Sequence, residues 1–289
     1  MALRGRKPKA VDKRLKALFF GPAGVGKTTA AIQFPQPYLI DTERGAENTQ
    51  YVAALEKSGG ALFQTTDYHE MVQEVRALLT EKHKFRTLVI DPVTVLYDHL
   101  VEEAERVHGN EWGRHYGEAN KHMKRLYALL LKLDMNVILT CHAKNEYRDG
   151  ELVGNTFDGW KKLDYMVDLA VALRREGERR LGVVRKSRIE GFPELEVFPW
   201  SYDEIASRYG GKILEKGATP VKMATAEQAA ELERLLELLR WPENSENGRT
   251  GWRKWLQKAD AHEWTDMACE QIQACLDYLH QQLKHEEVS

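Results

Sequence analysis

The chain has 289 residues, which is enough for one large α/β domain and a smaller appendage around a sizeable core. Its 43% hydrophobic and 30% charged residues are typical of a soluble globular protein, not of a disordered or membrane one. No stretch approaches the roughly 20 apolar residues of a membrane-spanning helix, and the basic N-terminus lacks the apolar segment of a secretory signal. We therefore expect a cytoplasmic protein with no membrane partner. The three cysteines lack the spacing of a zinc site, so we expect them to be reduced.

Charge is unevenly placed along the chain. The net charge of −2 and the pI of about 6.6 argue against a general polyanion binder. Residues 4–16, however, combine a single acid, Asp12, with a basic set: Arg4, Arg6, Lys7, Lys9, Lys13, Arg14 and Lys16. A basic arm over residues 1–14 would suit a phosphate backbone. A solvated tail that aids solubility is the alternative.

The first half of the chain alternates short apolar runs with helical patterns. Strands are expected at 15–20, 38–41, 87–91 and 136–141. Helices are expected at 27–34 and 67–81, and around the stripe of Met123, Leu126, Leu130 and Leu133. Strands that alternate with helices form parallel β-α-β units. We therefore expect an α/β domain whose mostly parallel sheet is flanked by helices.

The pattern changes in the second half. Runs at 167–174 and 181–185 flank the turn at 175–178 and predict an antiparallel hairpin on the far side of the sheet. Further on, Thr225-Ala-Glu-Gln228 is a capping-box start, and leucines and tryptophans at helical spacing follow it. The expected division is an arm, an α/β core, a linker and a small C-terminal helical domain: residues 1–14, 15–205, 206–218 and 219–289.

One octapeptide carries the strongest chemical signal. Residues 21–28 read Gly-x4-Gly-Lys-Thr between an expected strand and an expected helix, which is the context of a P-loop. Its glycines let backbone N–H groups point at phosphates, and the helix N-terminus adds its positive dipole end. We expect Lys27 to reach the β- and γ-phosphates of ATP, and the Thr28 hydroxyl to hold Mg²⁺. The expected nucleotide contacts are Gly21, Pro22, Ala23, Gly24, Val25, Gly26, Lys27, Thr28 and Thr29.

Two carboxylates are candidates for the remaining chemistry. Asp91 ends the run 88–91 and is expected to position Mg²⁺ in a Walker B role; a capping role before Pro92 is the alternative. No Glu follows Asp91, so the group that activates water must lie elsewhere. Glu43 comes just past the strand at 38–41, which we place beside the P-loop strand, and it would then face the γ-phosphate. The alternative is a solvated glutamate paired with Arg44.

These segments together resemble the RecA-like recombinase core over about residues 15 to 200. In that family a Glu follows the second strand in an Ile-Asp-x-Glu context, which Ile40-Asp41-Thr42-Glu43 matches. The resemblance also implies a polar γ-phosphate sensor after the strand at 136–141. RecA itself has Gln there, and His142 is a departure from that pattern.

RecA-like proteins also carry two basic residues of Lys-x-Lys spacing that reach the nucleotide of a neighbouring subunit. Lys186 and Arg188 have that spacing, and residues i and i+2 of a strand share a face. A solvated basic edge strand is the alternative. The resemblance therefore implies self-association as a filament or ring. The catalytic residues it implies are Lys27, Glu43, His142, Lys186 and Arg188.

The chain also resembles shortened RecA-like ATPases of bacteriophages, which act in single-strand annealing or recombination. That resemblance implies single-stranded DNA as a partner, in the bacterial host cytoplasm if the chain is phage-encoded. The C-terminal helices are weakly similar to modules of other phage recombination proteins. Such a module would bind a partner such as a single-strand binding protein, while stabilisation and self-association are the alternatives.

Two segments, about 106–120 and 144–162, correspond to the loops that face DNA in RecA-like proteins. Both mix basic and aromatic side chains, which suits single strands because charges follow the backbone and rings stack on bases. The expected DNA-binding residues are Arg114, Lys144, Arg148, Lys161 and Lys162. The interleaved rings are His108, Trp112, His115, Tyr116, Phe157 and Trp160.

We expect an ATPase that assembles on single-stranded DNA and promotes strand pairing. Two other classes stay open. One is a nucleotide or small-molecule kinase, in which arginines near 174–180 would imitate a lid, although a solvated bend explains them as well. The other is an ATP switch that loads or recruits a partner through residues 219–289. A GTPase is disfavoured because no Asn-Lys-x-Asp segment is present.

Overall fold

The computed structural model describes residue 7, residues 12–244 and residues 251–286, apart from the side chains of Glu47, Arg148 and Glu286. Contacts divide the chain into two units. The sheet unit comprises residues 1–67, 84–102 and 134–218, and the helical unit comprises residues 68–83, 103–133 and 219–289. Part of the expected basic arm lies outside the described residues: Arg4, Arg6 and Lys9.

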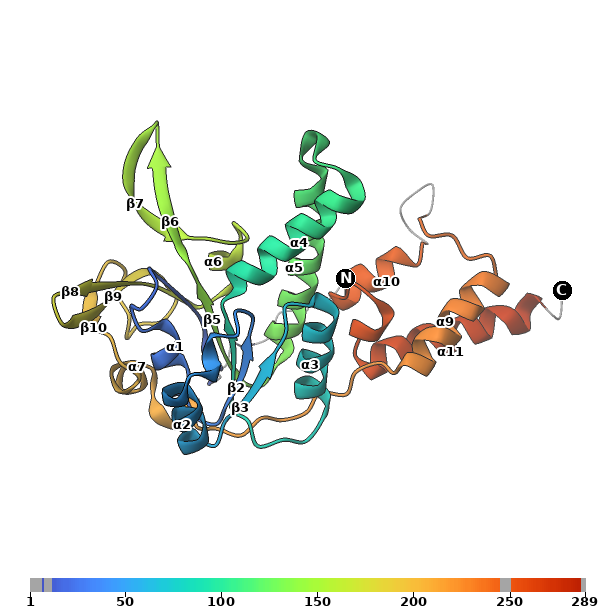
Figure 1. Ribbon diagram of the computed structural model, residues 1–289. Helices are drawn as coiled ribbons and strands as arrows, with labels where there is room; N and C mark the ends of the chain where they lie inside the picture. Colours follow the sequence, from blue (N-terminus) through green and yellow to red (C-terminus); the bar gives the residue numbers. More distant parts are fainter. Residues whose placement is uncertain (1–6, 8–11, 245–250, 287–289) are drawn as a thin grey trace. The chain divides into compact units, whose positions relative to one another are not determined.

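The sheet unit is built on a sheet with the strand order β10-β9-β8-β1-β5-β4-β2-β3 (Figure 1). The strands from β8 to β3 run parallel, and β9 and β10 are antiparallel to their neighbours. The strand bounds are β1 Lys16–Phe20, β2 Pro37–Asp41, β3 Ala61–Gln64, β4 Thr87–Asp91, β5 Asn136–Cys141, β8 Leu169–Glu176, β9 Arg179–Ser187 and β10 Val197–Pro199. The prediction of a mostly parallel α/β sheet with a hairpin on its far side is confirmed.

Helices flank this sheet, and its central strands are covered on both faces. Every residue of β1, β4 and β5 is buried, as expected for parallel strands whose sequences are continuous apolar runs. The helices are α1 Lys27–Ala31, α2 Thr49–Ser58, α4 Val93–His108, α6 Leu163–Met166, α7 Tyr202–Tyr209 and α8 Gly211–Leu214. The last turns of α4 belong to the helical unit.

The segment expected as a linker, 206–218, is mostly helical and belongs to the sheet unit. Ile205 in α7 and Leu214 in α8 are fully buried in the core of that unit. Arg14 donates to the carbonyl oxygen of Ile213 in α8 at 3.1 Å and to that of Lys216, just beyond α8, at 2.6 Å. The apolar positions are too few and too widely spaced for the sequence pattern to reveal these short helices.

Two residues of the basic set noted over residues 4–16 are buried in the fold: Arg14 at the end of the arm and Lys16 just beyond it. Arg14 is 7% exposed and forms an ion pair with Asp134 at 2.8 Å. The Lys16 ammonium donates to the Met135 carbonyl oxygen at 2.8 Å, and burial lowers its pKa to about 7. These two cations serve the fold and are not available to a polyanion, which corrects the prediction for this end of the arm.

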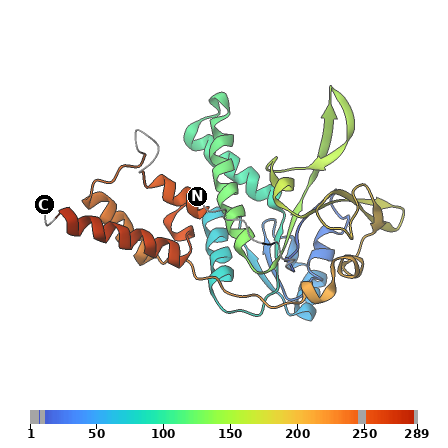
Figure 2. The same cartoon turned by 180° about the vertical axis from the view of Figure 1, so that it is seen from behind.

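A separate hairpin follows β5. Strands β6 Ala143–Arg148 and β7 Glu151–Phe157 pair antiparallel, where the sequence predicted a loop at 144–162. In Figures 1 and 2 this hairpin extends from the end of β5 away from the larger sheet. Its strands carry few apolar residues, which is why their alternation is hard to recognise in the sequence.

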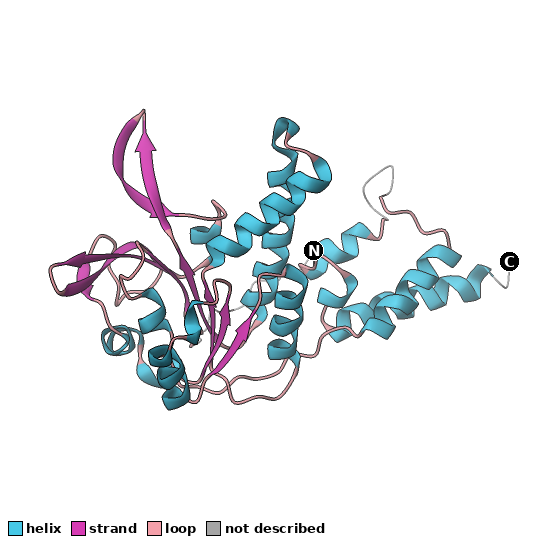
Figure 3. Cartoon of the chain, in the orientation of Figure 1, coloured by secondary structure: helices cyan, strands magenta, loops and turns pink. Residues whose placement is uncertain are grey.

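The helical unit, drawn mainly in cyan in Figure 3, consists of helices and short 3₁₀ turns. Its elements are α3 Tyr68–Thr80, η2 Glu111–Gly113, α5 Arg114–Lys132, α9 Ala226–Leu238, α10 Arg253–Ala259, η3 Trp264–Asp266 and α11 Cys269–Glu286. The predicted capping box at Thr225 and Gln228 is confirmed. The expected DNA-facing loop at 106–120 is mostly helical. Within the described residues, no helix combines the length and apolar character needed to span a membrane.

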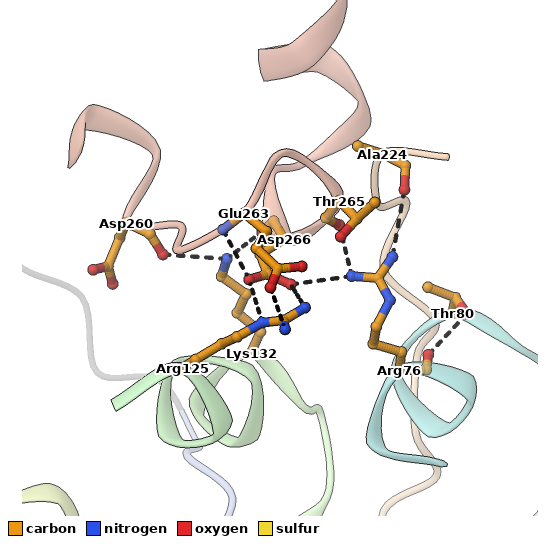
Figure 4. A network of polar contacts seen from close by, with 9 residues as sticks. All are labelled: Arg76, Thr80, Arg125, Lys132, Ala224, Asp260, Glu263, Thr265 and Asp266. Atoms are coloured by element: carbon orange, nitrogen blue, oxygen red, sulfur yellow. Dashed lines mark hydrogen bonds and ion pairs between the residues drawn. The ribbon is translucent and has the colours of Figure 1, made fainter. Parts of the chain in front are cut away.

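A buried carboxylate ties the elements of the helical unit together (Figure 4). Asp266 is 2% exposed, and its oxygens accept hydrogen bonds from Arg76 at 3.2 Å and Arg125 at 2.9 Å. Lys132 donates to the Asp266 backbone carbonyl at 2.7 Å. Cations from α3 and α5 thus hold the turn η3 that precedes α11.

Candidate active site

The loop between β1 and α1 has the geometry of a phosphate-binding loop. Gly24 and Gly26 have φ angles of +72° and +99°, which are strained for any residue with a side chain. A Cβ atom at Gly21 would lie 2.6 Å from the Leu173 carbonyl oxygen. Because α1 is only five residues long, loop amides and the Lys27 ammonium supply most of the positive charge here, more than a helix dipole does.

Lys27 lies inside this loop. Its side-chain ammonium donates to the carbonyl oxygens of Gly21 at 2.9 Å and Pro22 at 3.1 Å. Burial lowers the pKa of Lys27, while the nearby carboxylates of Asp91 and Glu43 raise it. The ammonium is therefore held among backbone oxygens at the place where a phosphate chain would pass.

Asp91 ends β4 beside Thr28, the first-turn hydroxyl of α1. Its carboxylate accepts hydrogen bonds from the hydroxyls of Thr140 and Thr28, and burial raises its pKa against the effect of these bonds. Carboxylate and hydroxyl oxygens are the hard ligands that Mg²⁺ prefers. The oxygen set therefore fits a magnesium nucleotide held by Lys27 and Thr28, with Asp91 close by.

The strand that leads to Glu43 is not adjacent to the P-loop strand. β2 pairs with β3 and β4, and both β4 and β5 separate it from β1. The prediction of adjacency is therefore wrong: two apolar runs look alike in sequence, and only the sheet order distinguishes them. Since parallel strands end at the same edge, Glu43 nevertheless lies at the edge where β1 and β4 end.

Glu43 meets His142 at that edge. The Glu43 Oε1 and His142 Nε2 atoms are 3.0 Å apart, and both side chains are about half exposed. The Asp41 carboxylate fixes the turn because it accepts the N–H groups of Glu43 and Ala46. Among the described residues Glu43 has no ion pair with Arg44, so the alternative of a simple Glu43–Arg44 pair does not hold.

A cavity of about 400 Å³ adjoins the phosphate loop. Besides loop residues it is lined by Gln50 and Tyr51 of α2 and by Arg180 of β9. The indole N–H of Trp200 donates to the Gly26 carbonyl oxygen at 3.1 Å. Sequence reasoning missed Tyr51 and Trp200, which lie in no motif, and it placed Arg180 in a solvated bend. The basic run 179–180 was the only available signal.

The sequence profile of the AAA domain family matches residues 13–191, which contain the P-loop, Asp91, Glu43 and His142. The chain belongs to the AAA domain family. It is a P-loop ATPase domain with a RecA-like sheet, in which β5 lies between the P-loop strand and the strand of Asp91. No curated protein matches the chain.

Two solved structures are similar to this AAA domain. A RadB recombinase shares 21% identity, with 72% of this chain and 91% of that chain covered and a TM-score of 0.43. An ATPase from the type III secretion system of pathogenic bacteria shares 15% identity, with 92% and 79% covered and a TM-score of 0.40.

Lys186 and Arg188 lie at the opposite edge of the sheet from the AAA domain's P-loop. Ala170 of β8 pairs with Lys186, and β9 ends at Ser187, so Arg188 is past the strand. Both nevertheless point to one place: Lys186 donates to the Asp164 carbonyl oxygen at 2.9 Å and Arg188 to that of Tyr165 at 3.0 Å. They do not reach the phosphate loop of their own chain.

The residues expected to bind DNA are distributed over both units. Lys144 lies on β6 and forms an ion pair with Asp158 at 2.8 Å, while Lys161 and Lys162 are exposed before α6. Arg114 is the exposed first residue of α5 in the helical unit, and the side chain of Arg148 lies outside the described residues.

Several rings expected among these cations are not available for stacking. Phe157 and Trp160 are 9% and 4% exposed, and His115 is also buried. His115 lies on α5 and Phe157 ends β7, and all three rings fill the protein interior. Of the expected rings, His108, Trp112 and Tyr116 are exposed, all in the helical unit, and Tyr147 on the β6–β7 hairpin is exposed as well.

Proposed function

We propose that this AAA domain protein is an ATP-dependent recombinase or annealing ATPase that binds single-stranded DNA, of the kind found in phage recombination systems. One observation carries the proposal: the Glu43–His142 pair joins the phosphate-binding edge to the start of the β6–β7 hairpin. The two residues follow different strands, β2 and β5, and they connect the proposed place of hydrolysis to an exposed hairpin.

The phosphate site supplies the first half of the activity. Bound Mg²⁺ would neutralise the phosphate oxygens and draw charge from the bond that breaks. Lys27 would hold the phosphate chain and the Thr28 hydroxyl the metal. Asp91 would position the metal from the end of β4. Glu43 orients a water molecule and accepts its proton. Tyr51 lines the cavity beside the loop and offers a ring for the adenine base.

The hairpin supplies the surface for DNA. Three apolar side chains on it are largely exposed: Tyr147 at 61%, Leu152 at 59% and Val153 at 50%. Exposed rings and apolar side chains next to lysines suit single strands, whose bases are free to stack. Lys144, Lys161 and Lys162 lie at the base of the hairpin or just beyond it.

A short chain of hydrogen bonds links this surface to His142. The backbone N–H of His142 donates to the Thr94 hydroxyl at 3.0 Å, and that hydroxyl donates to the Asp158 backbone carbonyl oxygen at 2.6 Å. The Asp158 carboxylate pairs with Lys144. A DNA phosphate that captures Lys144 would release Asp158, and the rearrangement would reach His142 and Glu43 through two hydrogen bonds. We infer that DNA stimulates hydrolysis in this way.

Assembly completes the proposal. Lys186 and Arg188 lie away from their own phosphate loop, which supports a role at the nucleotide of a neighbouring subunit in a filament or ring. We further propose that residues 219–289 form a partner-binding domain, with a single-strand binding protein as the candidate partner.

The decisive experiment measures ATP hydrolysis with and without a poly(dT) oligonucleotide, alongside annealing of complementary oligonucleotides. We expect stimulation by single strands, a weaker effect of duplex, and loss of turnover in Lys27→Ala. Glu43→Gln should keep nucleotide binding and lose turnover. Unstimulated hydrolysis by a protein that does not anneal strands would refute the proposal. Phosphate found on an added acceptor would show a kinase instead.

A further inference from the structure

The cavity beside the phosphate loop contains a second cation besides Lys27. It is bounded by Gly24, Gly26, Thr28 and Thr29 of the loop region and, from outside the loop, by α2 and by Arg180. The motifs recognised in the sequence do not include this arginine, and the sequence assigned Arg180 to a solvated bend. Its position therefore needs an explanation from the structure itself.

The backbone around Arg180 is fixed to the phosphate loop. Arg180 is the second residue of β9, and its carbonyl oxygen accepts the Trp200 N–H at 2.9 Å. The Trp200 indole in turn donates to the Gly26 carbonyl oxygen. Two hydrogen bonds through one rigid aromatic residue therefore set the distance between this arginine and Gly26.

The side chain of Arg180 lies over Gly26. A Cβ atom at Gly26 would be 3.2 Å from Cδ, 3.4 Å from Nε and 3.6 Å from Cζ of Arg180. The guanidinium is thus in contact distance of the loop whose amides face the phosphates. Only a glycine leaves room for it without displacement.

This guanidinium has no hydrogen bond or ion pair with any residue that the structure describes. Two other arginines of the same hairpin are engaged: Arg174 pairs with Glu176 at 2.8 Å, and Arg175 donates to the Gly177 carbonyl oxygen at 2.7 Å. A planar guanidinium binds phosphate oxygens through paired N–H donors, and such bonds are stronger than neutral ones. The unpaired cation beside the loop is set for an anion.

We propose that Arg180 binds the α- and β-phosphates of the nucleotide from its own chain. The cavity it lines includes Thr29 and Tyr51 but not Glu43, Asp91 or His142, which mark the γ-phosphate side. Arg180 therefore contacts phosphates that ADP and ATP share. It holds substrate and product alike and takes no part in cleavage. This inference rests on the proposed nucleotide site.

The test measures dissociation constants of the full chain for fluorescent N-methylanthraniloyl derivatives of ADP and ATP in the presence of Mg²⁺. Arg180→Ala should weaken binding of both by about tenfold or more, as expected for loss of a charge-assisted contact. Arg180→Lys should recover part of the affinity. The matched control is Arg179→Ala. It removes the same charge at the neighbouring position, from a side chain that does not line this cavity.

The outcomes separate this inference from the proposed function. If the unmodified chain binds neither nucleotide, the proposed nucleotide site fails. If it binds both and Arg180→Ala matches Arg179→Ala, the role of Arg180 is refuted. Weakened binding of the ATP derivative alone would place the guanidinium at the γ-phosphate and overturn the assignment. In hydrolysis assays, Arg180→Ala should raise KM and leave kcat near that of Arg179→Ala. Thermal unfolding of each variant checks that the fold is retained.

Discussion

Two buried aspartates, Asp91 in the sheet unit and Asp266 in the helical unit, have opposite surroundings. Asp266 is bonded directly by two arginines, and a lysine binds its backbone carbonyl. Among the described residues, the Asp91 side chain accepts hydrogen bonds from two hydroxyls, while the nearby Lys27 donates to backbone oxygens instead. A carboxylate whose charge is already matched holds a fold together. One left without a directly bonded cation is poised to interact with a ligand's metal.

The largest effect is expected on the structural side of this comparison. Asp266→Ala leaves Arg76 and Arg125 without their shared carboxylate, and removing one partner of a buried ion pair costs about 3–5 kcal/mol. Chemical denaturation followed by tryptophan fluorescence should show a less stable helical unit, which contains Trp252 and Trp264. Hydrolysis without DNA should change little.

The control for that variant is Glu263→Gln. Glu263 also pairs with Arg125, but its side chain is 55% exposed, so the expected loss is below about 1 kcal/mol. If both variants lost the same stability, the cluster would not depend on the buried charge of Asp266.

The matching change in the sheet unit should affect activity and not stability. Asp91→Asn removes a charge that burial already penalises, so thermal unfolding without nucleotide should show equal or greater stability. Hydrolysis should fall by about 100-fold or more, because the variant loses the carboxylate that is proposed to position Mg²⁺ at the phosphates. A variant that unfolds at lower temperature and keeps its turnover would reverse the roles assigned to the two aspartates.

Of the two aspartates, only Asp91 in the sheet unit could be assigned its role from the sequence. The P-loop follows one continuous apolar run and Asp91 ends another, so both strands and these site residues could be recognised together. Strand order could not be, which is why Glu43 was placed beside the P-loop strand. Arg180 and Trp200 lie far along the chain, and the pairing of β8 with β1 and of β9 with β8 and β10 brings them to Gly26.

The helical side was predictable only as a set of helices. The capping box and the leucine spacing identify α9, but nothing in the sequence pairs Asp266 with cations some 140 to 190 positions away. The same limit applies to Arg14 and Lys16, whose neighbours in sequence are basic while their partners, the Asp134 carboxylate and several carbonyl oxygens, are distant along the chain. A charged residue's role depends on contacts that composition does not encode.

The Glu43 carboxylate is intermediate between those of Asp91 and Asp266. It is about half exposed, and its partner is one imidazole ring, that of His142. His142→Ala should leave Lys27 and Asp91 unchanged and reduce the stimulation of hydrolysis by single-stranded DNA. Coupling between sites is commonly worth 1–3 kcal/mol, so we expect the stimulation to fall by about fivefold. The measurement is the ratio of turnover with and without poly(dT).

Thr65→Ala is a suitable control for His142→Ala, because Thr65 lies after β3, near the same edge but away from the hairpin. Its stimulation ratio should match that of the unmodified chain. If His142→Ala also kept the stimulation ratio of the unmodified chain, His142 would not couple the hairpin to the phosphate site. Any coupling would then follow another route.

The smallest effect concerns a third buried charge, the Lys16 ammonium at the start of β1. Its folded pKa is lowered to about 7 from 10.5, so between these values the unfolded chain binds more protons and stability rises with pH. The free-energy cost of burying the charged ammonium is fully present below pH 7, and it disappears as the pH approaches 10.5. Within that window the slope is at most about 1.4 kcal/mol per pH unit. Lys16→Met should remove this slope, seen by denaturation at pH 7.5 and 8.5, whereas an unchanged slope would mean that the ammonium is solvated in the folded chain.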